Sequence, residues 1–456
     1  NNEKKVLELF QIAQKQNLDI HPLALKLIID NLKKINKNIS KKEEILNIFV
    51  EILTSKKNPE KYLKLVNETG LLGKLIPDFQ KIDFIFLGLF LFLCLFGLLA
   101  VATASIEFSD SLTGEPLNFT KKQSIHLLVG LFLFLLFLSI PLTFWENFDR
   151  LLLGLGIVLL ILVFVPGIGV EVNGAHRWLR VGPVGLQPSE IMKLIMIIYI
   201  AGYSVRRLKD LQSNWFGFFK PAVLVVLVVS LVLIQPDLGT SAVIFTTVLG
   251  MLFVAGVKIR QFLVVIGLGL LGISALIVFV PWRWERIISF MDPWTDPFDG
   301  GYQLTLSLMA IGRGEWFGVG LGEGLMKLGY LPDAHTDFIF SIIVEEMGLF
   351  TAIIIIATLF FISFRSFHIG KKALERNLYF GFLISYGVGI LIGLHTFINV
   401  GVATGLLPTK GLTLPFLSYG GTNLLIMCSL CALVLRVDQE TKSAMPSISI
   451  SRRVSF

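Results

Sequence analysis

From Asp83 onward, apolar runs long enough to cross a membrane follow one another with only short polar intervals between most of them. A helix needs about 20 apolar residues to span the hydrocarbon core of a bilayer. Charged residues make up 16% of the chain, whereas a soluble domain has about 25%. The runs therefore predict an all-α polytopic membrane protein, since a helix satisfies its backbone hydrogen bonds internally where no water is available.

Ten transmembrane helices are predicted from these runs. They cover roughly residues 84–104, 124–143, 149–166, 188–204, 220–235, 238–256, 261–281, 337–363, 377–402 and 411–435. The spans define three parts of the chain: an extension at 1–82, a ten-helix domain at 83–440 and a tail at 441–456.

The orientation of the spans follows from the distribution of lysine and arginine. The loops after the fourth, sixth, eighth and tenth spans are the richer ones, and positive residues favour the cytoplasmic side. Both termini are therefore expected in the cytoplasm, and the loops at 105–123, 167–187, 282–336 and 403–410 outside. The net charge of +7 is scattered over short loops, which fits contact with anionic lipid and gives no reason to expect nucleic-acid binding.

Residues 1–82 are a different kind of sequence, rich in Lys, Asn and Glu with helical spacing of apolar residues. They predict a small soluble helical extension and lack the short apolar core of a signal peptide. The stretch at 58–79 resembles the helical segment before the phosphohydrolase domain of bacterial PII uridylyltransferases. No nucleotidyltransferase motif precedes it and no His-Asp metal motif follows, so we expect a non-catalytic fragment.

Charged residues within a predicted span are costly and usually mark a site, a pathway or an internal pair. Glu190 and Lys193 begin the fourth span at i,i+3, so they share a helix face. Two interpretations remain equally open: a salt bridge that lets the helix carry both charges, or a charged pair lining a groove for a polar headgroup. Asp237, between the fifth and sixth spans, is a candidate for the same cluster.

The eighth span carries Asp337, Ser341 and Glu345 at i, i+4 and i+8, which predicts one polar ridge facing the bundle interior or a cavity. His335 lies beside Asp337, but two candidate ligands are too few for a zinc site. A capping or hydrogen-bonding histidine is the favoured interpretation. The last outer loop, with Lys410 and Ser418, is rich in Pro and Gly; such irregular backbone is tolerated at membrane depth only against protein or a water-filled cavity.

The loop at 281–302 concentrates carboxylates, tryptophans and arginines in a Pro/Gly frame. Asp292, Asp296 and Asp299 are each well placed to initiate a turn. The expected position of this loop, directly above the outer membrane surface, makes a catalytic role for one of them the competing interpretation.

Several of these stretches match ordered motifs of one family. They are Gly174-Ala-His-Arg-Trp178, Gln187-Pro-Ser-Glu190 with Lys193, Gln235-Pro-Asp237, Asp296-Pro with Gly301-Tyr-Gln, Ala334-His-Thr-Asp337 and Pro408-Thr-Lys-Gly-Leu-Thr-Leu-Pro-Phe-Leu-Ser418. Over about residues 83–440 the chain resembles the SEDS family (shape, elongation, division, sporulation), and its cell-division members more than its elongation members. The extension and Asp333, where the family pattern has Glu, depart from it.

The resemblance implies a peptidoglycan glycosyltransferase of the cytoplasmic (inner) membrane that polymerises lipid II on the outer face at the division septum. Asp296 matches the invariant outer-loop acid, as general base or as ligand of a divalent cation (Mg²⁺ or Mn²⁺). The implied partners are a class B penicillin-binding transpeptidase, other division proteins and membrane lipid. The implied substrate-binding residues are Arg177, Trp178, Glu190, Lys193, Asp237, His335, Asp337, Glu345, Lys410 and Ser418.

The residues themselves agree with the ingredients of such a reaction. A carboxylate is needed to take a proton from the attacking sugar hydroxyl, and cations are needed to neutralise a leaving diphosphate. The outer-side candidates for positive charge are Arg177, Arg180, Lys193, Arg283, Arg286 and Lys410. Two other classes remain: a lipid II flippase, and a non-catalytic scaffold of the division machinery. A flippase needs polar groups along a path to both faces, whereas the polar residues here cluster in the outer half.

The predicted orientation is tested by cysteine labelling from outside intact cells or spheroplasts. Asp299→Cys should be labelled by a membrane-impermeant maleimide, because it lies in an expected outer loop. Ser443→Cys should stay protected until the membrane is opened. The reverse pattern would contradict the orientation derived from the lysines and arginines.

Overall fold

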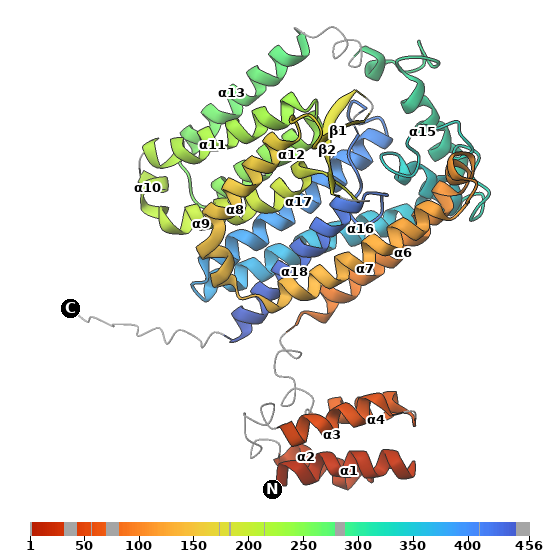
Figure 1. Cartoon of the computed structure of the whole chain (residues 1–456), viewed down its shortest axis with the longest axis vertical. Helices are drawn as coiled ribbons and strands as arrows, with labels where there is room; N and C mark the ends of the chain where they lie inside the picture. The colour runs from red at the N-terminus through yellow and green to blue at the C-terminus, as the bar shows by residue number, and fades with distance from the viewer. Residues whose placement is uncertain are drawn as a thin grey trace. The chain divides into compact units, whose positions relative to one another are not determined.

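A computed structural model describes residues 2–31, 43–55, 57–69, 82–172, 174–181, 184–213, 215–278, 288–409 and 411–443. The chain divides into two compact units, Asn1–Ile82 and Asp83–Phe456, which are drawn in Figure 1.

The described residues of the first unit form four helices: α1 (Asn2–Gln16), α2 (Pro22–Asn31), α3 (Glu43–Thr54) and α4 (Pro59–Glu68). Each contributes apolar residues to one small core, in which Leu7, Phe10, Ile52 and Tyr62 are fully buried. The hydroxyl of Tyr62 lies 3.0 Å from the carbonyl oxygen of Ala13, so this buried polar group has a hydrogen-bond acceptor.

The second unit is a bundle of long apolar helices. Its helices are α6 (Phe84–Thr113), α7 (Asn118–Ser139), α8 (Leu142–Leu162), α9 (Pro188–Arg206), α10 (Leu208–Ser213), α11 (Trp215–Ile234), α12 (Leu238–Val254), α13 (Ile259–Val278), α15 (Tyr302–Gly314), α16 (Ile339–Glu375), α17 (Tyr379–Ala403) and α18 (Gly421–Ser443). Within the described ranges, seven helices are long and apolar enough to cross a membrane. The predicted class, a helical polytopic membrane protein, is confirmed, while the count of ten spans remains a prediction.

A three-stranded antiparallel sheet is the main departure from an all-α chain. Its strands β1 (Gly169–Val172), β2 (Ala175–Val181) and β3 (Val184–Leu186) lie in the order β1-β2-β3. Side chains alternate across a strand, so Ala175, Arg177 and Leu179 share one face of β2. Ala175 and Leu179 are buried, and Arg177 therefore lies on the face of the strand that packs on the bundle.

Two predicted boundaries are corrected by the structure. The tenth span was expected from residue 411, but α18 begins at Gly421, because Pro415 and the glycines around it do not continue a helix. The expected loop at 282–336 contains α15. The sheet, residues 288–338 and residues 404–420 lie at the same end of the bundle (Figure 1), which we call the sheet end.

Helix α16 is interrupted at Gly348, whose φ of 80° breaks the helical hydrogen-bond pattern. The segment after α15 uses the break: the amide of Leu349 donates to the carbonyl of Glu315, and the amides of Val319 and Gly320 donate to the carbonyls of Glu345 and Glu346. Irregular backbone beside an apolar helix is thus satisfied by protein rather than by water. This pairing fixes part of the 288–338 segment against the bundle.

Helix α6 packs closely on the irregular segment that precedes α18. A methyl group at Gly97 would lie 2.1 Å from the carbonyl oxygen of Phe416, whereas one at Gly88 on the same helix would meet nothing within 4 Å. We expect Gly97→Ala to lower thermal stability in detergent, since overpacking costs about 1–3 kcal/mol. Gly88→Ala is the matched control and should not lower it. Equal melting temperatures for the two variants would contradict this packing.

Candidate functional site

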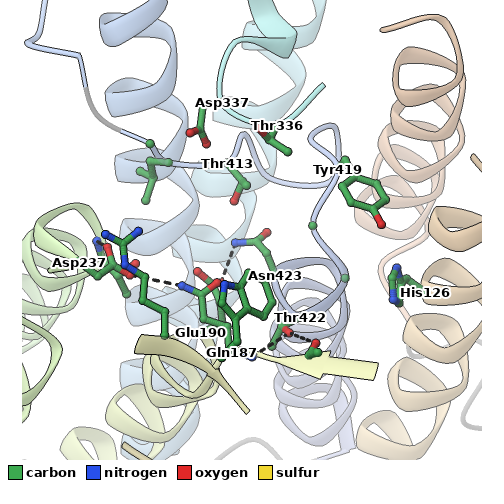
Figure 2. A pocket seen from close by; sticks show the side chains of 18 of the residues that line it. His126, Gln187, Glu190, Asp237, Thr336, Asp337, Thr413, Tyr419, Thr422 and Asn423 are labelled. Carbon is green, nitrogen blue, oxygen red and sulfur yellow. Dashed lines mark hydrogen bonds between the residues drawn. The ribbon is translucent and has the colours of Figure 1, made fainter. Parts of the chain in front are cut away.

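A cavity of about 700 Å³ opens at the sheet end of the bundle and is lined mostly by polar residues. Figure 2 shows it, with Asp337, Thr336 and Thr413 toward one end and Glu190, Gln187 and Asn423 toward the other. The lining comes from the start of α7, β2 and β3, the starts of α9, α12 and α18, and the segments before α16 and α18. These residues are Lys122, Ile125, His126, Arg177, Trp178, Gly185, Gln187, Glu190, Asp237, Thr240, Thr336, Asp337, Gly411, Leu412, Thr413, Tyr419, Gly420, Gly421, Thr422 and Asn423.

A buried ion pair lies at the floor of this cavity. The Lys193 ammonium is 2.7 Å from the Glu190 carboxylate, and their side chains are 0% and 7% exposed. Asn423 donates to Glu190 at 2.8 Å, and Lys193 is 3.0 Å from Nε2 of His395. The two charges form a salt bridge, as the first interpretation of the sequence has it. Glu190 also lines the cavity, which agrees with part of the second interpretation.

Asp237 caps the first turn of α12 and faces the cavity. Its carboxylate accepts from the amide of Thr240 at 3.1 Å and from the side chains of Gln187 and Ser189 at 3.4 and 3.5 Å. An acidic N-cap is favoured by the positive end of the helix dipole. Because Gln187 and Ser189 begin α9, Asp237 joins the starts of two helices.

Arg177 reaches from β2 to the break between α11 and α12. Its Nε donates to the carbonyl of Gln235 at 2.9 Å and its Nη2 to that of Pro236 at 2.7 Å. These bonds fix the guanidinium at the cavity wall, where its charge is available to a ligand bound in the cavity. Trp178, the next residue in β2, also lines the cavity.

Two polar residues of α17 hold the irregular segment before α18. Asn399 donates to the carbonyls of Asp337 and Leu412 at 2.9 and 2.6 Å, and Nδ1 of His395 lies 3.2 Å from the carbonyl of Thr413. The hydroxyl of Ser418 accepts from the amide of Leu414 at 2.8 Å. Ser418 therefore shapes the segment from inside, and it does not line the cavity.

Asp337 lies at the cavity wall just before α16. The pKa of Asp337 is raised to about 7 by burial and by the charges of Asp333 and Asp237, against the opposing charge of Arg177. The neighbouring His335 is packed among Phe108, Phe119 and Tyr419, and burial lowers its pKa. His335 thus supports the wall of the cavity with a neutral ring instead of reaching a ligand.

Glu345 does not extend a polar ridge from Asp337 along the cavity, as the sequence predicted it would. Its fully buried carboxylate accepts from Arg313 at 3.1 Å and from the amide of Leu325 at 2.9 Å. Ser341 pairs with Ser307 at 2.6 Å. Only Ser341 and Glu345 lie in α16, because the helix begins at Ile339 and Asp337 precedes it. Asp337 lines the cavity, whereas Ser341 and Glu345 bond to α15 and the segment after it.

Asp296 is exposed and does not line the cavity. Its carboxylate accepts from the amide of Gly300 at 3.3 Å, and its carbonyl accepts from Gly301 at 3.0 Å. It therefore forms a turn in the loop, whatever else it does. No group of three or more His, Cys, Asp or Glu that suits a metal occurs in the described ranges. Lys410, Arg283 and Arg286 lie outside the described residues.

Several cavity residues were not singled out from the sequence. Gln187 falls within a quoted motif, but no role was assigned to it, and Tyr419 and Asn423 were missed. Also missed were His395 and Asn399, which hold the segment before α18 without lining the cavity. The available signal for His395 and Asn399 was their i,i+4 spacing within a predicted span, where polar residues seldom face lipid.

Comparison with known proteins finds a matching family model for each unit. A family model described as a cell cycle protein, FtsW/RodA/SpoVE, matches residues 83–443, and a model of the third domain of uridylyltransferase GlnD matches residues 1–75. The second match confirms the resemblance of the extension to uridylyltransferases.

Individual relatives and solved structures agree with the first match. The probable peptidoglycan glycosyltransferase FtsW of Saccharophagus degradans is 44% identical over 376 residues, which cover 82% of this chain and 97% of that protein. The corresponding protein of Nitrosococcus halophilus is 45% identical over 360 residues, or 79% and 93% of the two chains. A structure described as coordinating polymerization and crosslinking in a peptidoglycan synthase complex has a TM-score of 0.65 and 28% identity, covering 79% and 98% of the two chains. Rod shape determining protein RodA of Thermus thermophilus has a TM-score of 0.58 and 27% identity, covering 79% and 97%.

The buried pair at the cavity floor generates a stability prediction. Glu190→Gln leaves the Lys193 ammonium without its carboxylate, and breaking a buried pair from one side costs about 3–5 kcal/mol. The control is Glu115→Gln, which breaks the exposed Lys121–Glu115 pair of the same 2.7 Å length and should leave stability unchanged. Thermal unfolding in detergent measures both. A Glu190→Gln protein as stable as the control would show that the pair is dispensable for the fold.

Proposed function

The chain belongs to the FtsW/RodA/SpoVE family, and from this membership we propose that it is a peptidoglycan glycosyltransferase that polymerises lipid II. The observation that carries the proposal is the extent of the similarity. Relatives named peptidoglycan glycosyltransferase align over nearly their whole length, and the matched region at 83–443 includes every residue that lines the cavity.

The cavity fits the chemistry of that substrate class. Lipid II joins a disaccharide pentapeptide to a polyprenyl chain through a diphosphate, so its site needs polar space beside an apolar bundle. The cavity provides carboxylates for sugar hydroxyls at Glu190, Asp237 and Asp337, and positive charge at Arg177 and Lys122. Fixed positive charge that meets the leaving diphosphate stabilises the transition state more than the ground state.

A divalent cation, Mg²⁺ or Mn²⁺, remains part of the proposal. Mg²⁺ keeps several water ligands and commonly combines one or two carboxylates with substrate phosphates. Asp296, on an exposed loop, is the carboxylate that we assign to it. Bound in this way, the cation would supply charge neutralisation at the diphosphate.

The cellular setting follows from the same family. We place the protein in the cytoplasmic membrane at the division septum with both termini in the cytoplasm, acting with a class B penicillin-binding transpeptidase and other division proteins. A glycan polymerase and its cross-linker must meet the same strand, and one structural neighbour is described as coordinating the two activities. The extension at 1–82 is assigned no part in the reaction, because its match covers only the third domain of a uridylyltransferase.

The position of the cavity disfavours the alternative that the protein is a flippase. Transport requires polar groups along a path to both faces of the membrane, and the lining of the cavity comes from the sheet end of the bundle. A non-catalytic scaffold would have no use for a polar cavity of about 700 Å³. The deciding experiment is polymerisation of labelled lipid II by the purified full chain.

Within that assay, Asp296→Asn keeps the size of the side chain and removes the charge that a base or a cation ligand needs. Polymerisation should fall on the order of 10²–10⁴-fold, the range of general-base contributions, while folding persists. Asp292→Asn and Asp299→Asn in the same loop are the controls and should have much milder effects. A near wild-type rate for Asp296→Asn would remove this residue from the mechanism.

A further inference from the structure

We propose that Asp337 is the catalytic carboxylate that accepts the proton of the attacking sugar hydroxyl. The inference rests on the proposed glycosyl transfer and goes beyond it by assigning the proton acceptor to the cavity wall instead of the exposed loop. Four features of the structure carry it: a carboxylate with no donor among the described residues, its rigid support, its charged surroundings and its position relative to Asp296.

The first feature is that the Asp337 carboxylate has no hydrogen-bond donor among the described residues. The other two carboxylates of the cavity are occupied: Glu190 by Lys193 and Asn423, and Asp237 by its amide cap and two side chains. Within the described part of the chain, no donor bonds to the Asp337 oxygens. A partly buried carboxylate without a partner is costly, so its position in the cavity needs a ligand that donates a hydrogen bond.

The second feature is that Asp337 is held rigidly from its backbone. Its amide donates to the carbonyl of Asp333 at 3.1 Å, and its carbonyl accepts from Asn399 at 2.9 Å. Gly411 gives the carboxylate room, because a methyl group there would lie 2.5 Å from Asp337 Oδ2. The main chain is thus fixed, while no described residue bonds to the carboxylate; a fixed main chain is part of the preorganisation expected of a catalytic group.

The third feature is the set of charges around this carboxylate. Asp333 precedes it in the same turn, Asp237 faces it from α12, and Arg177 faces it from β2. Lys122 of α7 and the paired Glu190 of α9 complete the charged lining. Burial and the charges of Asp333 and Asp237, opposed by the charge of Arg177, bring the pKa of Asp337 to about 7. A general base is most effective when its pKa lies near the working pH.

In the proposed step, one C–O bond forms at the anomeric carbon and another breaks. An oxygen of the acceptor sugar hydroxyl attacks the anomeric carbon of the donor, and a new C–O bond forms there. The bond from that carbon to the diphosphate breaks, and its electron pair leaves with the diphosphate, which Arg177 helps to neutralise. The hydroxyl proton passes to a carboxylate oxygen of Asp337 and later to water. No oxidant or reductant is required.

The fourth feature is the contrast with Asp296. Asp296 is exposed and lies outside the cavity lining. The two acids then have separate roles: Asp337 takes the proton, and Asp296 would hold a cation that supplies positive charge for the diphosphate. Loss of either lowers the rate, but only the loss of Asp337 removes the titration of the base.

The test measures kcat/KM for labelled lipid II against pH, with the purified full chain and three variants. In the wild type, kcat/KM should rise as pH increases through about 7, because the deprotonated carboxylate is the active form. Asp337→Asn should lower kcat/KM on the order of 10²–10⁴-fold and abolish the rise. The variant is isosteric and removes a desolvated charge, so thermal stability in detergent should be equal or higher.

The matched control is Asp333→Asn. Asp333 is exposed with a φ of 53°, a conformation that Asn also tolerates, and its backbone carbonyl still accepts from residue 337. Its negative charge raises the pKa of Asp337. Its removal should therefore move the rise to lower pH, and the plateau rate should fall by less than tenfold because the base becomes slightly weaker. A residue that only shaped the cavity wall would not respond in this way. Asp296→Asn, measured in parallel, should lose rate but keep the rise.

Three outcomes would overturn the assignment. The first is a kcat/KM of Asp337→Asn within tenfold of the wild-type value. The second is an Asp337→Asn protein whose kcat/KM is low but still rises with pH, because that result indicates a positioning role. The third is loss of the rise in Asp296→Asn, which returns the base to the loop. If the wild-type chain does not polymerise lipid II at all, the proposed function fails, and that failure is distinct from the other three.

Discussion

The Glu190–Lys193 pair is the interaction on which the cavity depends. Two charges taken out of water require close partners, and here the partners come from three helices: α9 supplies both charges, α17 supplies His395 and α18 supplies Asn423. The requirement to satisfy the pair therefore fixes these helices relative to one another. Because Glu190 also faces the cavity, the same bonds that join the bundle define the floor of its polar site.

The remaining walls are irregular backbone, and the bundle satisfies them with side chains. A segment that is neither helix nor sheet leaves carbonyls unpaired, and an apolar surrounding offers no water for them. Asn399 and His395 supply donors to the carbonyls of Leu412 and Thr413. Arg177 does the same for the break between α11 and α12. These hydrogen bonds thus hold segments rich in Pro and Gly in defined positions around the cavity.

The sequence predicts the bundle well, because hydrophobic length and charge asymmetry are local properties. It also identifies Arg177, Glu190, Asp237 and Asp337, all of which line the cavity. It does not predict the sheet, whose strands of three to seven residues carry too little periodicity. Nor can spacing along α16 show that α15 covers Glu345, since that depends on where a loop of the chain returns to the bundle.

The location of the polar groups also bears on the kind of chemistry that the fold supports. A site at one end of the bundle lets a lipid-linked substrate keep its chain in the membrane while its sugars enter a polar space. Low dielectric there strengthens the electrostatic interaction between Arg177 and a negatively charged ligand. Burial is also the largest of the effects that raise the pKa of Asp337 to about 7. In the proposed mechanism, one low-dielectric cavity thus supplies both the positive charge that meets the diphosphate and the base that meets the sugar hydroxyl.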